Sequence, residues 1–301
     1  MQRVRELVAA NMPNGIDGRG VTIAVLDSGL SNHPDLMGRV IGFRDFVGHR
    51  NLMYDNNGHG THVCGILCGN GGLSAGRYRG MAPGAKLVVG KVLDERGDGR
   101  TETMLEGLDW ILQVRERYRI RILNISVGIG SLDEWEKERA LRDKIEELWE
   151  IGILVVCAAG NKGPGDNTIS SVGGSSRVVT VGCHDGSYAR ENPARCETYS
   201  GRGMPGSFIR KPDLVAPGTD IVSCNAYYRS LTGKNRKAYT TKSGTSMATP
   251  VVSGAAALLF QKHPDSTNEQ CKQQLQFSAT DLGLPWNQQG WGMLHVERLL
   301  L

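Results

Sequence analysis

Short apolar runs rich in β-branched residues alternate with helical segments along most of the chain, and this alternation constrains the fold more than any other feature. Runs typical of buried strands lie at 21–26, 86–92, 120–127, 151–159 and 178–181, and segments with helical spacing at 59–68, 101–118 and 133–150. Parallel strands that are buried on both faces give continuous apolar runs, and helices must cross between them. The sequence therefore predicts an α/β fold whose mainly parallel central sheet is covered by helices on both faces.

Composition excludes two classes of partner. The formal charge of +4 comes from 35 basic and 31 acidic residues that are scattered along the 301-residue chain, without a basic run interleaved with aromatics. We therefore expect no nucleic-acid partner. The longest apolar stretch, 151–159, is interrupted by Gly152 and is far shorter than the roughly 20 residues of a membrane span. We expect no membrane partner either.

The N-terminal region, residues 1–19, is expected to be an extension in front of one large domain, residues 20–301. Its sequence has no continuous apolar region and no small-residue cleavage site of the kind found in signal peptides. We therefore expect a cytoplasmic protein. No linker, low-complexity tract or internal repeat divides the rest of the chain.

The seven cysteines are an odd number in a chain that we expect to stay in the cytoplasm, so reduced thiols are favoured. No CxxC motif or Cys/His cluster with metal-ligand spacing occurs. Cys64 and Cys68 lie four residues apart in a predicted helix. Such a pair can be a redox or metal site, but two small core residues are the commoner arrangement.

The segment 243–260, SGTSMATPVVSGAAALLF, places Ser246 at the start of an apolar helix. Gly244 allows a sharp turn before the helix, and Pro250 lies early enough for its missing N–H to cost little. The free N–H groups and the positive dipole end of a helix stabilise negative charge, as a nucleophilic serine requires. The alternative is that Ser246 only caps the helix, so its partners must decide.

Asp27 and His59 are the other two residues that suggest chemistry. Asp27 ends the apolar run VTIAVL, at the edge of a parallel sheet where ligands bind, although an Asp in this position can simply be a turn residue. His59 follows the turn 56–58 and is flanked by Gly58 and Gly60, so other groups can approach its ring closely. A histidine in that setting can be a general base or a structural residue.

Four sequence blocks together resemble those of subtilisin-like serine proteases. They are AVLDSGL around Asp27, NGHGTHVCG around His59, AAGN ending at Asn161 and SGTSMATP around Ser246, in the order and spacing of that family. HPDL at 33–36, GMAP at 80–83 and LVAPG at 214–218 are similar to its intervening landmarks. The likeness is greatest to intracellular bacterial members. It implies the three-layer subtilisin fold, with residues 20–301 as the peptidase domain.

The resemblance also implies a role for each of the four residues. Ser246 is the nucleophile, His59 its general base, and Asp27 the carboxylate that orients the imidazole; the chain order Asp, His, Ser is that of subtilisin. Asn161 would donate its side-chain amide to the oxyanion, together with the backbone N–H of Ser246. The chemistry that follows is serine endopeptidase chemistry, without any cofactor.

Substrate-binding residues are implied in the same way. Peptide or protein substrates would add as an extended strand between two chain segments. These segments and the adjoining pocket residues are Ser126, Val127 and Gly128 on one side, Gly97, Asp98 and Gly99 on the other, Thr101 and Met104 at S4, and Ala158, Ala159, Gly160 and Lys162 around S1. We expect a preference for large apolar P1 residues. No inhibitor can be named from the sequence.

A structural calcium ion is possible, because the family binds one at the Asp of HPDL, here Asp35. The loop that should complete the site reads NGGLSAGRYRG and has no carboxylate. We therefore expect Arg77 or Arg79 to pair with Asp35 in place of the ion. Carbonyl groups of this loop could still hold a hard cation.

Two other functions compete with that of an active protease. A catalytically silent member of the fold could bind or regulate a partner, but such proteins normally lose a catalytic residue, and Asp27, His59, Ser246 and Asn161 are all present. A serine esterase of the α/β-hydrolase type would need the motif GxSxG around its serine. It would also need the catalytic residues in the chain order serine, acid, histidine. Neither feature occurs.

Overall fold

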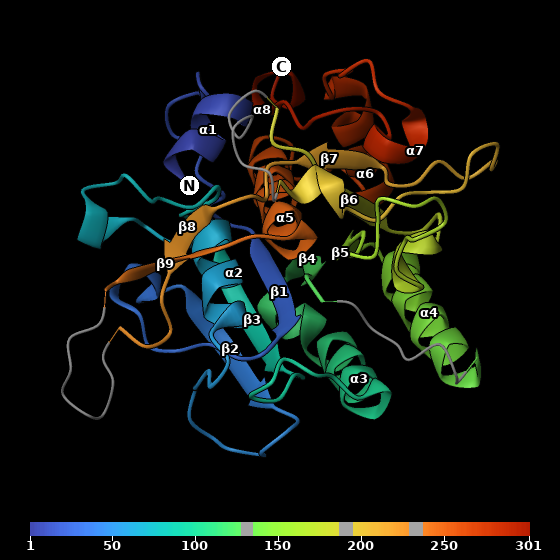
Figure 1. Cartoon of the computed structure of the whole chain (residues 1–301). Coiled ribbons are helices and arrows are strands. Elements are labelled where there is room, and N and C mark those ends of the chain that lie inside the picture. Colours follow the sequence, from blue (N-terminus) through green and yellow to red (C-terminus); the bar gives the residue numbers. More distant parts are fainter. Residues whose placement is uncertain (128–134, 187–194, 229–236) are drawn as a thin grey trace.

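Seven strands form a fully parallel central sheet in the order β2-β3-β1-β4-β5-β6-β7 (Figure 1). The computed structural model describes residues 1–127, 135–186, 195–228 and 237–301. The strands of the sheet are β1 (Thr22–Asp27), β2 (Val40–Asp45), β3 (Lys86–Lys91), β4 (Ile120–Ile125), β5 (Leu154–Ala158), β6 (Val179–Cys183) and β7 (Leu214–Ala216). Two further strands, β8 (Ile221–Cys224) and β9 (Tyr239–Lys242), form an antiparallel pair beside it.

Eight α-helices surround this sheet in the described part of the chain. They are α1 (Gln2–Val8), α2 (His59–Cys68), α3 (Thr101–Tyr118), α4 (Trp135–Glu150), α5 (Thr245–Lys262), α6 (Asn268–Ser278), α7 (Trp286–Gln289) and α8 (Val296–Leu299). α2 packs against α5, and α3 packs against α4. α5 runs through the middle of the molecule along strands β4 to β7 (Figure 1).

The last two residues of β1 show that the α2–α5 pair and the α3–α4 pair cover opposite faces of the sheet. Side chains alternate between the faces of a strand. Leu26 contacts α3, because a Cβ added to Gly107 would lie 3.1 Å from its Cδ2 atom. Asp27, the next residue, faces α2 and bonds to His59. The sheet is therefore the middle of three layers, and the predicted fold class is confirmed.

The strand and helix positions agree with the sequence apart from their ends. β4 stops at Ile125 instead of continuing to 127, and β5 begins at Leu154, because Gly152 (φ +92°) turns the chain between α4 and β5. α4 begins at Trp135, whereas the expected start at 133 lies outside the described residues. The sequence did not predict β2, β7, β8, β9 or α6.

Residues 1–19 are packed on the same core as the rest of the chain. The helix α1 buries Met1, Val4 and Val8, and Leu7 is partly buried beside them. Within the residues that the structure describes, no helix combines the length and apolar character needed to cross a bilayer.

The cysteines differ from the expectation of seven reduced thiols. Cys183 and Cys196 form a disulfide, so that expectation is wrong for this pair. It failed because the partners lie 13 residues apart and no local pattern marks them. The five free cysteines are Cys64, Cys68, Cys157, Cys224 and Cys271, and all are buried. Cys64 and Cys68 are thus core residues of α2.

Candidate active site

The carboxyl ends of the parallel strands bring the proposed catalytic residues to one edge of the sheet. Asp27 is the last residue of β1, and Asn161 follows β5 by three residues. The helix α2 begins at this edge with His59. The helix α5 also begins there, and Ser246 is its second residue, two residues after the N-cap Gly244. Residues from four distant parts of the sequence therefore share one edge, where open parallel sheets bind ligands.

Asp27 and His59 form a short hydrogen bond. The Nδ1 atom of His59 lies 2.7 Å from Oδ1 of Asp27, which also accepts the N–H of Ser28 at 2.7 Å. The Asp27 side chain has no exposed area, whereas the His59 side chain is 21% exposed. The histidine can therefore meet a substrate while the carboxylate behind it stays shielded from water.

Two opposing effects act on the pKa of His59. Burial favours the neutral ring and lowers the pKa, whereas the Asp27 carboxylate raises it through its charge and its hydrogen bond. The carboxylate prevails, so the pKa of His59 is raised above its ordinary value of 6.5. An imidazole can both take and return a proton, as a general base must.

Asp55, which the sequence analysis overlooked, fixes the start of α2. Its Oδ2 atom accepts the N–H and the hydroxyl of Thr61 at 2.9 and 2.6 Å, and its Oδ1 atom accepts the hydroxyl of Ser28 at 2.9 Å. The same Ser28 hydroxyl accepts the N–H of Gly60 at 2.9 Å. Free N–H groups of the first turn are thus satisfied, which holds His59 in place. The available signal was an aspartate four residues before the histidine.

Lys91 is a second residue that the sequence analysis did not single out. It ends β3 beside Asp27, is fully buried, and donates to the carbonyl oxygens of Ser28 and Leu93 at 2.7 and 2.6 Å and to Oδ1 of Asn56 at 2.9 Å. Burial lowers its pKa, while the surrounding carboxylates act in the opposite direction. One ammonium group therefore joins the three loops that surround Asp27.

His62 lies one helical turn after His59 and is fully buried. Burial, with the nearby His59 as the second cause, lowers the pKa of His62 to about 3. Its Nε2 atom is hydrogen-bonded to the carbonyl oxygens of Ile221 and Thr240 at 2.9 and 3.3 Å. Because a neutral ring donates there, His62 joins α2 to the β8–β9 pair and takes no part in proton transfer.

Asn161 is oriented by the residue before the serine. Its Oδ1 atom accepts the N–H of Thr245 at 3.1 Å and the hydroxyl of Thr245 at 3.0 Å. A Cβ added to Gly244 would lie 3.5 Å from Nδ2 of Asn161 and 3.8 Å from the backbone nitrogen of Ser246. Nδ2 of Asn161 and the backbone nitrogen of Ser246 therefore lie near the same point beside Gly244.

Ser246 lies in the first turn of α5, and its residue is half-buried. In the part of the chain that the structure describes, no hydrogen bond joins its Oγ atom to His59. Hydrogen bonds between nucleophile and base are often long without substrate and shorten when substrate binds. The structure thus brings Asp27 to His59 and Asn161 to the turn before Ser246.

The segment 97–99 lies beside the histidine loop. Gly97 (φ +86°) would bring an added Cβ within 3.2 Å of Nδ2 of Asn57, two residues before His59. Asp98 and Gly99 are exposed, and Gly99 pairs with Leu93 in an antiparallel bridge. This is a suitable edge for an added peptide strand.

The two residues expected at S4 differ in exposure. Thr101, the first residue of α3, is half-buried. Met104 is only 1% exposed. Its side chain therefore belongs to the core, and any contact with substrate at this point falls to Thr101.

The segment expected on the other side of the substrate, residues 126–128, has few side chains that a substrate could contact. Ser126 is fully buried, and its hydroxyl accepts the side-chain amide of Asn124 at 2.8 Å, so the side chain is not available to a substrate. Val127 is half-buried, and Gly128 lies outside the described residues.

The residues expected at S1 lie at and just after the end of β5. Ala158 and Ala159 are buried, and their carbonyl oxygens accept bonds from Ser170. Gly160 (φ +94°) adopts a conformation that favours glycine, and it turns the chain towards Asn161. Lys162, the next residue, is exposed.

Asp35 stands where the resemblance implies calcium, and protein groups bond to both of its carboxylate oxygens. Its Oδ1 atom accepts the N–H of Leu73 at 3.1 Å, and its Oδ2 atom accepts the hydroxyl of Tyr239 at 2.7 Å. Hydrogen-bond donors thus point at both oxygens that would bind the ion. Arg77 donates instead to Oε1 of Gln2 at 3.0 Å. The expectation that a guanidinium pairs with Asp35 is therefore wrong, because an amide and a phenol do so.

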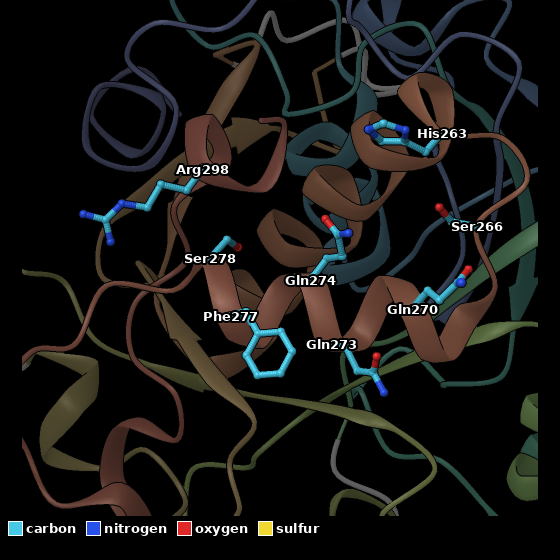
Figure 2. A pocket seen from close by; sticks show the side chains of 8 residues that line it. All are labelled: His263, Ser266, Gln270, Gln273, Gln274, Phe277, Ser278 and Arg298. Carbon is cyan, nitrogen blue, oxygen red and sulfur yellow. The ribbon is translucent and has the colours of Figure 1, made fainter.

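A separate groove of about 550 Å³ lies at the far end of α5 (Figure 2). Polar side chains from α6, together with His263 after α5 and Arg298 of α8, line it. The helix rises about 1.5 Å per residue, so this groove is roughly 25 Å from Ser246. It does not belong to the candidate active site.

Comparisons with known proteins agree with this geometry. Residues 18–292 match the Subtilase family. The serine protease AprX of Bacillus subtilis is 42% identical over 276 residues, which are 88% of this chain and 62% of AprX. Subtilisin Savinase of Lederbergia lenta is 35% identical over 99% of this chain and 96% of its own sequence.

Solved structures give the same result. The chain is similar to Sphericase with a TM-score of 0.82 and 28% identity, covering 98% of this chain and 99% of that one. A cold-adapted subtilisin-like serine proteinase superimposes with a TM-score of 0.71 and 30% identity, over 95% and 92% of the two chains.

Proposed function

Because this chain belongs to the subtilase family and is a serine protease, we propose that it cleaves peptide bonds with Asp27, His59 and Ser246 as its catalytic triad and Asn161 as an oxyanion donor. The observation that carries the proposal is the 2.7 Å bond between Nδ1 of His59 and Asp27, at the sheet edge where α5 begins. A histidine held in this way presents Nε2 to the entrance of the site.

Each group has one task in the proposed reaction. Ser246 Oγ attacks the substrate carbonyl while Nε2 of His59 takes its proton, and the imidazolium that forms is stabilised by Asp27. The oxyanion accepts hydrogen bonds from Nδ2 of Asn161 and from the backbone N–H of Ser246. His59 then gives its proton to the leaving amine, and water hydrolyses the acyl-enzyme by the same sequence of steps.

Labelling with a fluorophosphonate probe tests the assignment directly. The probe reacts with an activated serine, so wild type should be labelled at Ser246 and Ser246→Ala should not be labelled. Equal labelling of the two would show that the nucleophile lies elsewhere, and an absence of labelling in both would favour a silent, partner-binding member of the fold.

The pH dependence of turnover follows from the raised pKa of His59. Only the neutral ring accepts a proton, so kcat/KM should rise with pH and reach half its maximum above pH 6.5. Asp27→Asn removes the charge that raises the pKa, and burial then prevails. The residual activity of this variant should therefore rise at lower pH. An identical midpoint in the two proteins would contradict the proposed coupling.

We also propose that S1 prefers large apolar side chains and that Lys162 modifies this preference. Burying apolar area contributes about 25 cal/mol per Å², whereas an exposed charge at the rim is worth about 0 to 1 kcal/mol. Apolar P1 residues should therefore bind best. Among charged P1 residues, glutamate should be tolerated better than lysine, by about 2- to 5-fold at low salt.

Matched peptides with Phe, Leu, Lys or Glu at P1 measure this effect. In Lys162→Glu the ratio of kcat/KM for the Glu and Lys peptides should reverse at low salt, and the difference should shrink at high salt as charges are screened. Phe and Leu peptides serve as the control, because their binding does not depend on the charge at residue 162. An unchanged Glu-to-Lys ratio would exclude a role for Lys162.

We propose that the Asp35 region is stable without calcium. EDTA should therefore leave the Tm unchanged, whereas Tyr239→Phe should destabilise the protein by about 1 to 3 kcal/mol, because the buried carboxylate of Asp35 loses the donor to its Oδ2 atom. Both melts should use the Ser246→Ala background, which prevents self-digestion. A Tm that falls in EDTA and recovers with calcium contradicts the proposal if Asp35→Asn removes the effect; if the effect persists, it arises at another site.

A further inference from the structure

The Cys183–Cys196 disulfide lies at the same edge of the sheet as the candidate active site. Cys183 is the last residue of β6, and Cys196 begins the short 3₁₀ turn Cys196–Thr198. The two residues are 2% and 0% exposed. Since β6 is parallel to β1 and β5, its carboxyl end points towards the edge that holds Asp27 and Asn161.

Asp185 connects this disulfide to a loop at residues 218–219. It is fully buried, and its Oδ1 atom accepts the N–H groups of Gly218 and Thr219 at 3.0 and 2.9 Å. Its Oδ2 atom accepts the hydroxyl of Thr219. That hydroxyl oxygen also accepts the N–H of Cys196 at 2.8 Å. The disulfide and the loop therefore form one hydrogen-bonded unit.

Gly218 links this hydrogen-bonded unit to the turn before Ser246. A Cβ at Gly218 would lie 2.6 Å from Sγ of Cys183 and 2.6 Å from the carbonyl oxygen of Gly244. The sulfur and that carbonyl oxygen therefore both lie close to Gly218, where only a glycine fits without a shift. The N–H of Gly244 donates to the carbonyl of Gly218 at 3.0 Å. Gly244 is the N-cap of α5 and flanks Asn161. One residue thus separates the disulfide from the nucleophile turn.

Breaking the bond would disturb this packing. Bonded sulfurs are about 2 Å apart, whereas non-bonded heavy atoms prefer about 3.5 to 4 Å. The two sulfurs must therefore separate by roughly 1.5 Å, and Sγ of Cys183 already lies close to Gly218 on one side. A displacement of about 1 Å near a catalytic group can reduce the rate about 10²-fold.

We propose that the Cys183–Cys196 pair is a redox-sensitive site that positions the nucleophile turn, so that turnover is high when the disulfide is formed and low when both residues are thiols. This inference rests on the proposed function, because it takes Ser246 as the nucleophile. Oxidation removes two electrons and two protons from the two thiols and forms the S–S bond. A small-molecule disulfide such as oxidised glutathione accepts them and becomes two thiols.

The burial of both sulfurs decides how the experiment is done. A reductant reaches them only when the chain opens, so the oxidation state should be set during refolding, with a glutathione redox buffer or with excess dithiothreitol. The form with the disulfide should show the five free thiols of the other cysteines after denaturation, and the reduced form should show all seven. Each form is then assayed for kcat, KM and the rate of fluorophosphonate labelling.

We expect the reduced form and the Cys183→Ala/Cys196→Ala variant to share a kcat at least about 10-fold below that of the oxidised form, with KM within about 2-fold. Unfolding the reduced form and refolding it in the oxidising buffer should restore the wild type but not the variant. Cys271→Ala, which removes a buried thiol of α6, should keep the full dependence on oxidation.

Equal kcat values in the two oxidation states would overturn the inference, and labelling of Ser246 would still support the proposed function. If the oxidised form is not labelled at all, the proposed function itself fails. Gly218→Ala tests the same path without changing a cysteine, since its Cβ would collide with Cys183 and Gly244. It should lower kcat, whereas Gly174→Ala, which has open space around it, should not. An unchanged kcat in Gly218→Ala would also overturn the inference.

Discussion

Replacing Ser246 with alanine is expected to lower kcat by about 10⁶-fold, and replacing His59 with alanine by a similar factor. The scale is that measured in subtilisin, another member of this family, in which loss of the serine or the histidine costs about 2 × 10⁶. The cause is that the serine hydroxyl is a weak nucleophile unless a base removes its proton, so either loss disables the same step.

The double variant separates a working triad from two independent contributions. If Ser246 and His59 act as one unit, His59→Ala/Ser246→Ala should be only slightly less active than either single variant. Independent effects would multiply instead. Single-turnover assays with a chromogenic peptide measure the residual rates, and Ser266→Ala, which removes a hydroxyl at the far end of α5, should retain wild-type kcat. Multiplying losses would exclude the proposed pairing.

The second large effect is on stability and concerns Asp213. This carboxylate is 2% exposed and lies 2.7 Å from Nζ of Lys211 and 3.3 Å from Nζ of Lys272, which are themselves nearly buried. Asp213→Asn would leave two buried ammonium groups without a counter-charge. Losing one partner of a buried ion pair costs about 3 to 5 kcal/mol. For a chain of this size we expect a fall in Tm on the order of 10 °C.

Thermal melts in the Ser246→Ala background measure this loss without self-digestion. Asp143→Asn is the matched control, since it removes the same charge from an exposed ion pair with Arg139 and should cost at most about 1 kcal/mol. If the two variants melt at the same temperature, the buried charges do not stabilise the fold.

Acid should remove the stabilisation by Asp213. Burial by itself raises the pKa of this carboxyl, but Lys211 and Lys272 outweigh it and lower the pKa below the ordinary 3.8. A carboxyl with a depressed folded pKa stabilises the protein above its unfolded pKa, and this is lost as pH falls through the folded value. The difference in Tm between wild type and Asp213→Asn should therefore be constant above about pH 5 and shrink below pH 4.

The strands that the sequence predicted have no exposed face. β1, β5 and β6 consist of buried residues only, so their runs are continuous and stand out from the rest of the chain. β2 is an edge strand, and five of its six residues are half-buried or exposed. Neither a continuous run nor a clear alternation marks such a strand.

Other missed features fall into two groups. α6 could have been predicted, because Thr267 and Gln270 form a capping box three residues apart that is visible in the sequence. The disulfide and the bonds of Asp35 to Tyr239 could not, since they join residues that only the fold brings together. The roles of Asp27 and His59 could be predicted from short sequence motifs, because each motif includes the turn that positions its residue.

The burial of His62 has a consequence for how activity responds to protons. His59 and His62 are neighbours on one helix, yet the pKa of His62 is lowered to about 3 while that of His59 is raised above 6.5. Of these two imidazoles, only that of His59 therefore titrates in the range where we expect activity to rise. The logarithm of kcat/KM plotted against pH should rise with a limiting slope of one, which is the signature of a single ionisation.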